Sequence, residues 1–199
     1  MKKGIIAIIV LGILGVIIVG WYVRTNNNLI NMKGQATKQW ANVESSYQRR
    51  NDLIGNLVKT VQGAADFERE TLQEGIEARS RATSPPIDAN NLSAAQLAEF
   101  QQAQSGLSSA LSRLLVTVER YPELRANQNF LELQSQLEGT ENRINVARDR
   151  YNEAVNTYDI HIKKFPNTIL AGWFGFEEMP RYTADAGSEV APDVNFDFD

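Results

Sequence analysis

The sequence predicts an all-α protein, in which a single N-terminal transmembrane helix is followed by an antiparallel bundle of three long helices, or four if the first breaks near Gly55. Three observations predict this fold class. Residues 4–23 form one uninterrupted apolar run. After it, apolar residues recur at spacings of three and four, the period of an amphipathic helix. Finally, the alternation typical of a strand reaches no useful length anywhere in the sequence.

The apolar run at 4–23 is long enough to cross a membrane. A helix of this length spans roughly 30 Å, the thickness of a bilayer's hydrocarbon core. The run closes with Trp21 and Tyr22, aromatic residues typical of the membrane interface, and Arg24 follows. A cleaved signal peptide and a buried soluble helix are the alternatives. However, the run is longer than the usual signal-peptide core, and no small-x-small cleavage site follows it. We therefore expect an uncleaved anchor after a short flank, residues 1–3.

The cations on either side of the anchor favour one orientation. Lys2 and Lys3 precede it, whereas Arg24 follows it and Lys33 and Lys38 lie further along. Cations close to a span are preferentially retained in the cytoplasm. We therefore expect the flank inside and the bundle on the extracytoplasmic side; the excess is small, and the opposite orientation stays an alternative.

The first long helical pattern after the anchor covers residues 29–82. Proline is absent until Pro85, but Gly55 and Gly63 interrupt the pattern, and each costs about 1 kcal/mol relative to alanine. We therefore expect a kink or break near Gly55. The stripe consists of Leu29, Ala36, Trp40, Val43, Tyr47, Ile54, Leu57, Val61 and Ala64, with Arg50 in the same row.

A second helix is predicted at 94–120. Turn residues and paired prolines at 83–91 mark the loop before it. Ser93 and Gln96 have the spacing of a capping box, in which side chains bind the free amides at a helix start. The helix should end before Pro122, because a residue that precedes proline resists helical geometry.

A third helix is predicted from residue 127 or 129 to Phe165, where Pro166 stops it. A short apolar stretch follows at 169–176. Its long stripe consists of Phe130, Leu133, Leu137, Ile144, Ala147, Tyr151, Val155, Tyr158, Ile162 and Phe165.

Charge divides the chain after the anchor into two parts. The bundle region, 24–176, sums to zero, whereas 177–199 holds seven acids against Arg181 alone. A neutral domain lacks the basic footprint of a nucleic-acid-binding protein, so we expect no nucleic acid as partner. An acidic segment with scattered proline and glycine is typical of disorder, and we expect the tail at 177–199 to be disordered.

Catalytic and metal-binding patterns are not found in the sequence. Paired metals in helical bundles use Glu-x-x-His motifs, but His161 is the single histidine and Tyr158 stands three residues before it. The sequence contains no cysteine, no Gly-x-Ser-x-Gly turn and no phosphate-binding glycine loop. We therefore expect no catalytic residue, metal or cofactor.

Four charged residues lie on or beside the apolar stripes: Arg50, Glu68, Glu141 and Arg148. Buried charges must be paired, because an unpaired one costs several kcal/mol. We therefore expect a structural polar layer in which Arg50 pairs with Glu68 or Glu141. The alternative is a set of exposed ion pairs, each worth under about 1 kcal/mol.

Trp173, Phe174 and Phe176 form the densest aromatic cluster. They could close the open end of the bundle, which we favour. Alternatively, they form a contact patch for a partner or a lipid surface.

Several sequence motifs carry a family resemblance. They are Arg49-Arg50-x-Asp52-Leu53-Ile54-x-Asn56-Leu57-Val58, Tyr121-Pro122-x-Leu124-x-Ala126-Asn127-x-Asn129-Phe130-x-x-Leu133-Gln134, Thr140-Glu141-Asn142-x-Ile144-x-x-Ala147-Arg148-x-x-Tyr151-Asn152, Phe165-Pro166 and Gly175-Phe176. Together they resemble the LemA family of bacterial membrane proteins, over about residues 1–180 and with the acidic tail outside the match. The resemblance implies an N-terminal anchor and a helical bundle, but no activity or catalytic residue.

These observations favour a single-pass protein of the bacterial inner membrane that acts as a non-enzymatic scaffold or interaction module. Its expected partners are the lipid bilayer and unidentified proteins. One alternative is a self-associating protein that shapes or organises the membrane; glycines at 12, 15 and 20 would permit close approach of anchors, although they do not form GxxxG. A hydrolase that uses paired carboxylates in a bundle groove is the other alternative.

Overall fold

The computed structural model describes residues 2–63, 67–83, 88–89 and 91–183. Over these ranges the protein is helical and contains no strand, which confirms the predicted all-α class. The helices are α1 (Lys2–Gln62), α2 (Arg69–Ala82), α3 (Ala94–Val118), α4 (Pro122–Arg125), α5 (Gln128–Lys163) and α6 (Asn167–Phe174).

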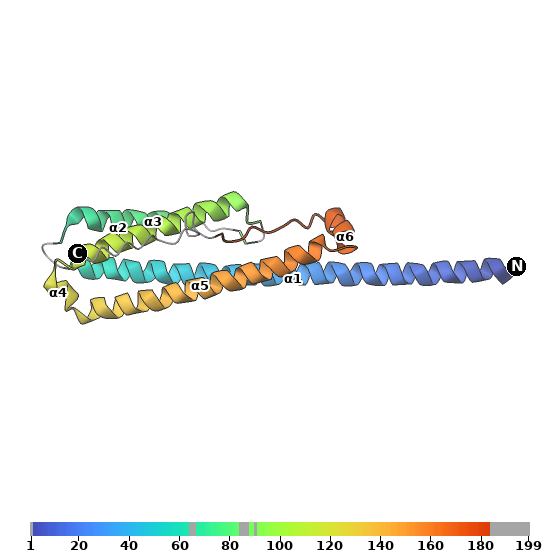
Figure 1. The fold of residues 1–199 in the computed structure, drawn as a ribbon, viewed down its shortest axis with the longest axis horizontal. Coiled ribbons are helices and arrows are strands. Elements are labelled where there is room, and N and C mark those ends of the chain that lie inside the picture. Colours follow the sequence, from blue (N-terminus) through green and yellow to red (C-terminus); the bar gives the residue numbers. More distant parts are fainter. Residues whose placement is uncertain (1, 64–66, 84–87, 90, 184–199) are drawn as a thin grey trace, which may run out of the picture.

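The bundle is an up-down-up-down arrangement of α1, α2, α3 and α5. The helix α5 lies along α1 for most of its own length, and α2 and α3 pair with each other on the other side of α1 (Figure 1). The N-terminal third of α1 extends beyond the bundle (Figure 1). The short α6 lies at the bundle end nearest to this extension, and α4 lies at the opposite end.

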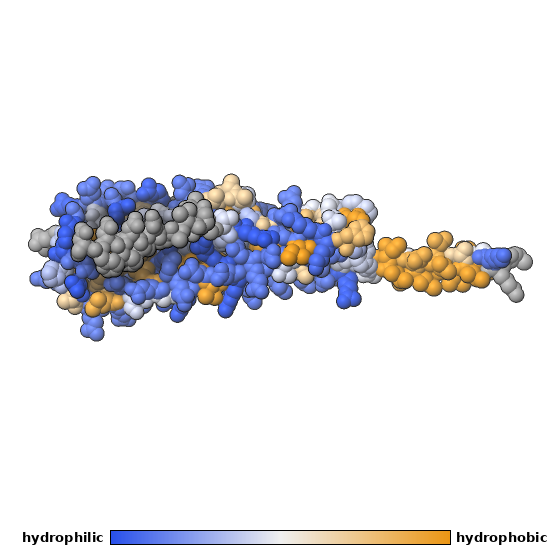
Figure 2. Space-filling view, viewed as in Figure 1, coloured by the Kyte–Doolittle hydropathy of each residue, from blue (hydrophilic) through white to orange (hydrophobic). Residues whose placement is uncertain are grey.

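The extension of α1 carries the predicted anchor. It is long and apolar enough to cross a membrane, and its large side chains from Ile5 to Val19 are each about half exposed or more. Figure 2 shows it as an apolar rod that leaves a largely hydrophilic bundle. Because α1 continues without interruption from this rod into the bundle, the rod fixes the direction of the bundle axis.

The predicted break near Gly55 is wrong. Helix α1 passes through Gly55 and ends at Gln62, so the fourth bundle helix arises from a break between Gln62 and Arg69. A Cβ atom at Gly55 would lie 3.0 Å from the guanidinium of Arg79 on α2. Arg79 Nε donates a hydrogen bond to the Asn51 carbonyl oxygen at 2.9 Å. The glycine therefore makes room for a neighbouring helix rather than ending its own.

The helix ends follow the local signals in the sequence. Ser93 Oγ accepts from the Gln96 amide at 3.2 Å, and Gln96 Oε1 accepts from the Ser93 amide at 2.9 Å, so the predicted capping box caps α3. Asn127 caps α5 in a similar way. Helix α5 ends at Lys163, two residues earlier than predicted.

Two apolar clusters make up the core. The first, near the apolar extension, joins α1, the start of α3, α5 and α6 and includes Leu29, Trp40, Tyr151 and Tyr158. The second, at the far end, joins α1, α2, α3, α4 and the start of α5 and includes Leu107. The buried polar side chains of Arg50, Asn51, Gln104 and Thr140 lie at positions between these clusters.

The prediction that residues 177–199 are disordered is wrong for 177–183. This segment, which we call the strap, has no helix, and it packs on the bundle with Met179 and Tyr182 buried in the first apolar cluster. The acidic residues beyond Thr183 lie outside the described residues. The ordered bundle region therefore extends at least seven residues beyond its predicted end at 176.

Candidate functional site

Arg50 is the centre of the polar layer. Only 4% of its surface is exposed, and its guanidinium binds two other helices. Nη2 donates to Gln104 Oε1 of α3 at 2.6 Å and to the Gln104 carbonyl oxygen at 3.3 Å. Nη1 donates to Ser108 Oγ at 3.2 Å and to Glu141 Oε2 of α5 at 3.1 Å.

Gln104 extends this network to the remaining bundle helix. Its Nε2 donates to the carbonyl oxygen of Ala82, at the last residue of α2, at 3.0 Å. The four bundle helices therefore meet through Arg50, Gln104, Glu141 and the end of α2. Among the buried side-chain nitrogen and oxygen atoms of this set, only Arg50 Nε has no partner, so the layer serves the alignment of the helices.

The structure brings together two of the four predicted layer residues. Arg50 and Glu141 form an ion pair at 3.1 Å, in which the Glu141 side chain is 51% exposed. Glu68, by contrast, lies just before α2 and pairs with Arg120 at 2.7 Å on the surface. Arg148 lies over the ring of Tyr182, with its Cζ 4.7 Å from the ring centroid.

Tyr182 shows how the strap is held. Its ring stacks on the ring of Trp40 at a centroid distance of 6.0 Å, and both side chains are buried. Asn152 binds its backbone on both sides, because Oδ1 accepts from the Tyr182 amide at 2.9 Å and Nδ2 donates to its carbonyl oxygen at 3.1 Å. Tyr151 Oη donates to the Pro180 carbonyl oxygen at 2.8 Å, and Tyr158 Oη donates to that of Glu177 at 3.0 Å.

The strap also supplies the partner of a buried acid. Asp159 is only 2% exposed, and its Oδ2 lies 2.6 Å from Arg181 Nη2. Its Oδ1 accepts from the Met179 amide at 3.2 Å. A buried carboxylate needs such partners because its desolvation costs several kcal/mol. The single cation of the acidic tail therefore neutralises the inner face of α5.

The tyrosines under the strap are shifted toward their neutral forms. Burial, with the negative charges of Asp159 and Glu177, raises the pKa of Tyr158 to about 12. Burial, followed by the charge of Asp159, also raises the pKa of Tyr151. Burial is the main cause of the raised pKa of Tyr182. The hydroxyl groups of Tyr151 and Tyr158 are thus structural donors at neutral pH, whereas that of Tyr182 is buried without a hydrogen-bond partner among the described residues.

The structure places the three residues of the predicted aromatic cluster in different environments. Phe176 packs on the first apolar cluster. Trp173 is 76% exposed and Phe174 is 41% exposed. Phe174 contacts the Tyr22 ring of α1 edge to face at a centroid distance of 5.3 Å. End-capping of the core therefore falls to Phe176, together with Leu170 and Ala171.

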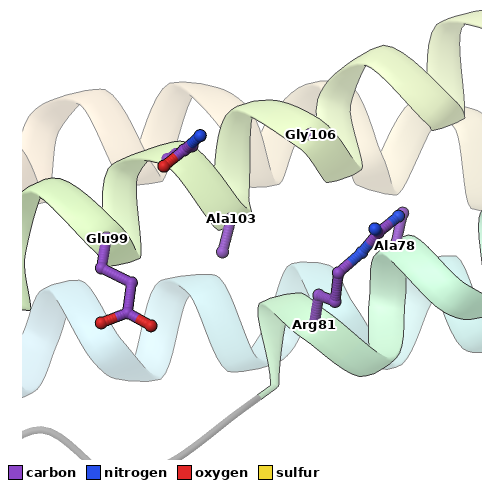
Figure 3. A pocket seen from close by; sticks show the side chains of 6 residues that line it. Ala78, Arg81, Glu99, Ala103 and Gly106 are labelled. Atoms are coloured by element: carbon purple, nitrogen blue, oxygen red, sulfur yellow. The ribbon is translucent and has the colours of Figure 1, made fainter.

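Grooves on the bundle are shallow and open. The groove in Figure 3 holds about 460 Å³ between α2 and α3. Arg81 and Ala103 point into the space between the two helices, and Glu99 lies further along α3 (Figure 3). The other groove-lining residues are Ala78, Gln102 and Gly106. This groove brings together one acid and one base with small side chains and offers no converging carboxylates.

Within the ranges that the structure describes, no three His, Cys, Asp or Glu residues lie close enough to hold a metal ion. Asp159 is the one acidic residue among those described that is buried, and Arg181 already binds it. The arrangement supports packing and alignment of helices rather than acid–base chemistry.

Sequence reasoning missed Gln104 and the pair of Asp159 and Arg181. Both had a signal. Gln104 stands in the stripe of α3 between Phe100 and Leu107, and Asp159 stands in that of α5 between Tyr158 and Ile162. A polar residue in an apolar row requires a partner, and Arg181 is the one cation in 177–199.

These features define a class: a membrane-associated helical-bundle protein whose inner polar groups bind one another. Comparison with known families agrees with it. The sequence pattern of the LemA family matches residues 39–196, and the chain belongs to the LemA family. The predicted resemblance is confirmed, but its predicted limit near residue 180 is wrong, because the match includes the strap and most of the acidic tail.

Individual relatives are distant. Magnetosome proteins MamQ 1 and MamQ 2 of Paramagnetospirillum magneticum are each 27% identical in an alignment of 189 positions that covers 86% of this chain and 70% of theirs. Protein LemA of Metamycoplasma hominis is 23% identical over 150 residues, which is 75% of this chain and 65% of its own.

Proposed function

We propose that this protein is a non-enzymatic scaffold, anchored in the bacterial inner membrane by α1, whose bundle binds other proteins of the envelope. One observation carries the proposal: the charged side chains that are buried in the described bundle are bound by other residues of the same chain. Arg50 and Asp159, its two charged buried side chains, bind Gln104, Glu141 and Arg181. A partner protein would therefore bind the outer surface of the bundle.

The geometry gives such a scaffold a defined reach. About 38 residues of α1 lie between Arg24 and its end at Gln62. At about 1.5 Å per residue this carries the far end of the bundle roughly 60 Å from the membrane. Because α1 is a single helix from the apolar rod to Gln62, the bundle stands on the membrane without a flexible linker.

The orientation of the scaffold is also a proposal. Lys2 and Lys3 outnumber Arg24 near the apolar segment, which favours the bundle on the extracytoplasmic side. Protease added to intact spheroplasts should digest the bundle. Digestion only after lysis would place the bundle in the cytoplasm instead.

Photo-crosslinking in native membranes tests the scaffold itself. A photoreactive residue is placed at one exposed position on each bundle helix, for example at Gln102 on α3 and Glu138 on α5. We expect one face to give a heterologous crosslinked product in repeated preparations, while the other faces do not. Products with the mass of two copies of this chain would favour the self-associating alternative, and no reproducible product from any face would overturn the proposal.

A further inference from the structure

The search for a further site leads to the membrane-proximal end of the bundle, where several large apolar side chains are exposed. Phe165 is 80% exposed, Ile169 is 43% exposed and Trp173 is 76% exposed. Ile169 and Trp173 are four residues apart on α6, so they lie on one face of this helix. Phe165 lies in the turn two residues before α6. We call Phe165, Ile169, Trp173 and Phe174 the α6 patch.

The opposite side of α6 packs on the bundle. Leu170 and Ala171 are buried against the bundle and hold α6 in place. The α6 patch is therefore not a surface exposed by a loosely attached helix. It faces outward because the packing of Leu170 and Ala171 turns it outward.

The position of the α6 patch along α1 identifies its occupant. The Phe174 ring contacts the Tyr22 ring at a centroid distance of 5.3 Å, and Tyr22 lies at the end of the apolar run 4–23. If that run spans the bilayer, Tyr22 lies at the interface between hydrocarbon and headgroups. Phe174 and the rest of α6 then lie at the same depth.

The chemistry of the α6 patch fits that depth. Tryptophan and phenylalanine on one face of a short helix are typical of segments that lie in the membrane interface. Arg24, two residues beyond Tyr22, and Lys164, beside Phe165, are both exposed and can reach lipid phosphates. Val19 and Val23, which lie close to Tyr22 along α1, are exposed apolar side chains as well.

We propose that α6 is a second membrane contact, which inserts Phe165, Ile169, Trp173 and Phe174 into the interface of the bilayer that α1 spans. This inference rests on the proposed anchor. One span alone would leave the bundle free to tilt and rotate. A second contact beside the span fixes which face of the bundle turns toward the membrane and holds the bundle axis upright.

Spin labels at single cysteines test this, because the natural chain has no cysteine. The full-length protein is reconstituted in phosphatidylcholine vesicles with and without phosphatidylglycerol. Labels are placed by Ile9→Cys in the apolar run, Ile169→Cys on α6 and Val116→Cys on α3. Power saturation with oxygen, which partitions into lipid, and with a water-soluble nickel chelate reports the depth of each label.

We expect position 169 to show an oxygen-to-nickel ratio between the lipid value at position 9 and the water value at position 116, in both lipid mixtures. Trp173→Ser with Phe165→Ser should move position 169 to the value of position 116. The matched control, Ile76→Ser with Leu131→Ser, removes two exposed apolar residues on α2 and α5 and should change nothing at 169. Circular dichroism confirms that both double variants keep their helix content.

Three results would overturn the proposal. A water value at 169 with a lipid value at 9 would remove the second contact and leave the anchor intact. Loss of collisions with both reagents at 169 would show that a protein covers the α6 patch. A water value at position 9 would overturn the anchor and the α6 contact together.

Discussion

Arg50 of α1 and Gln104 of α3 are joined by a hydrogen bond of 2.6 Å at the level where the two apolar clusters of the core meet. The bond is buried from both sides, since both residues are less than 5% exposed. A buried acceptor that loses its donor costs about 1 to 3 kcal/mol. Loss of Arg50 should therefore cost more stability through the buried, neutral Gln104 than through the half-exposed Glu141.

Replacement of Arg50 tests this ranking. Arg50→Met should lower the free energy of unfolding by about 2 to 3 kcal/mol, because Gln104 Oε1 loses its donor in a buried site. Glu141→Gln should cost less than about 1 kcal/mol, because the Glu141 side chain is half exposed and the amide can still accept. Urea unfolding of the full-length protein in mild detergent, followed by circular dichroism, measures both. An Arg50→Met variant as stable as the natural protein would show that the layer adds no net stability.

The pair of Asp159 and Arg181 gives a second prediction. Arg181→Met should lower the free energy of unfolding by roughly 2 to 3 kcal/mol, because it leaves a buried carboxylate with a single backbone donor. Adding Asp159→Asn should restore part of the loss, since the unpaired charge is then removed. Lys163→Met, which breaks an ion pair exposed by more than half on each side, is the control and should cost under about 1 kcal/mol. Equal effects of Arg181→Met and Lys163→Met would contradict the buried pair.

The raised tyrosine pKa values predict a loss of stability in alkali. Above pH 10 the tyrosines ionise in the unfolded chain, whereas Tyr158, with a pKa of about 12 in the folded protein, stays neutral there. Its contribution is therefore fully present below pH 10 and is lost as the pH rises through 12, at up to about 1.4 kcal/mol per pH unit.

Tyr158→Phe separates this effect from general alkaline unfolding. At pH 8 it should cost about 1 kcal/mol, because the hydrogen bond to the Glu177 carbonyl oxygen is lost. Between pH 10 and 12 its free energy of unfolding should fall less steeply than that of the natural protein, because one proton fewer is linked to unfolding. Parallel curves over this range would contradict the link.

The periodicity of the sequence was enough to predict the bundle. The stripes of α1 and α5 contain Trp40, Tyr151 and Tyr158, all fully buried, because residues three and four apart share one helix face. Composition misled at the tail. Its acidity indicates disorder when averaged over 177–199, yet Met179 and Tyr182 of the strap are buried in the first apolar cluster.

The partners across the bundle could not be predicted from local pattern. Glu68 and Glu141 were equal candidates for Arg50, because periodicity places residues on a face but does not give the offset between two helices. Helix α1 ends at Gln62 rather than at Gly55 and α2 begins at Arg69, so Glu68 lies away from the layer, on the surface near Arg120.

Gly55 gives the last prediction, because a Cβ atom at this position would crowd the guanidinium of Arg79. Alanine in place of an interior helix glycine normally stabilises by about 1 kcal/mol. Gly55→Ala should gain clearly less than this, because the new Cβ atom would lie 3.0 Å from the Arg79 guanidinium and would disturb its bond to Asn51. In an Arg79→Ala background the full gain should return. Gly34→Ala, where a Cβ meets no atom within 4 Å, should stabilise equally in both backgrounds. A double-mutant cycle measured by urea unfolding gives the coupling free energy, and a value of zero for Gly55 and Arg79 would show that close approach of α2 does not require this glycine.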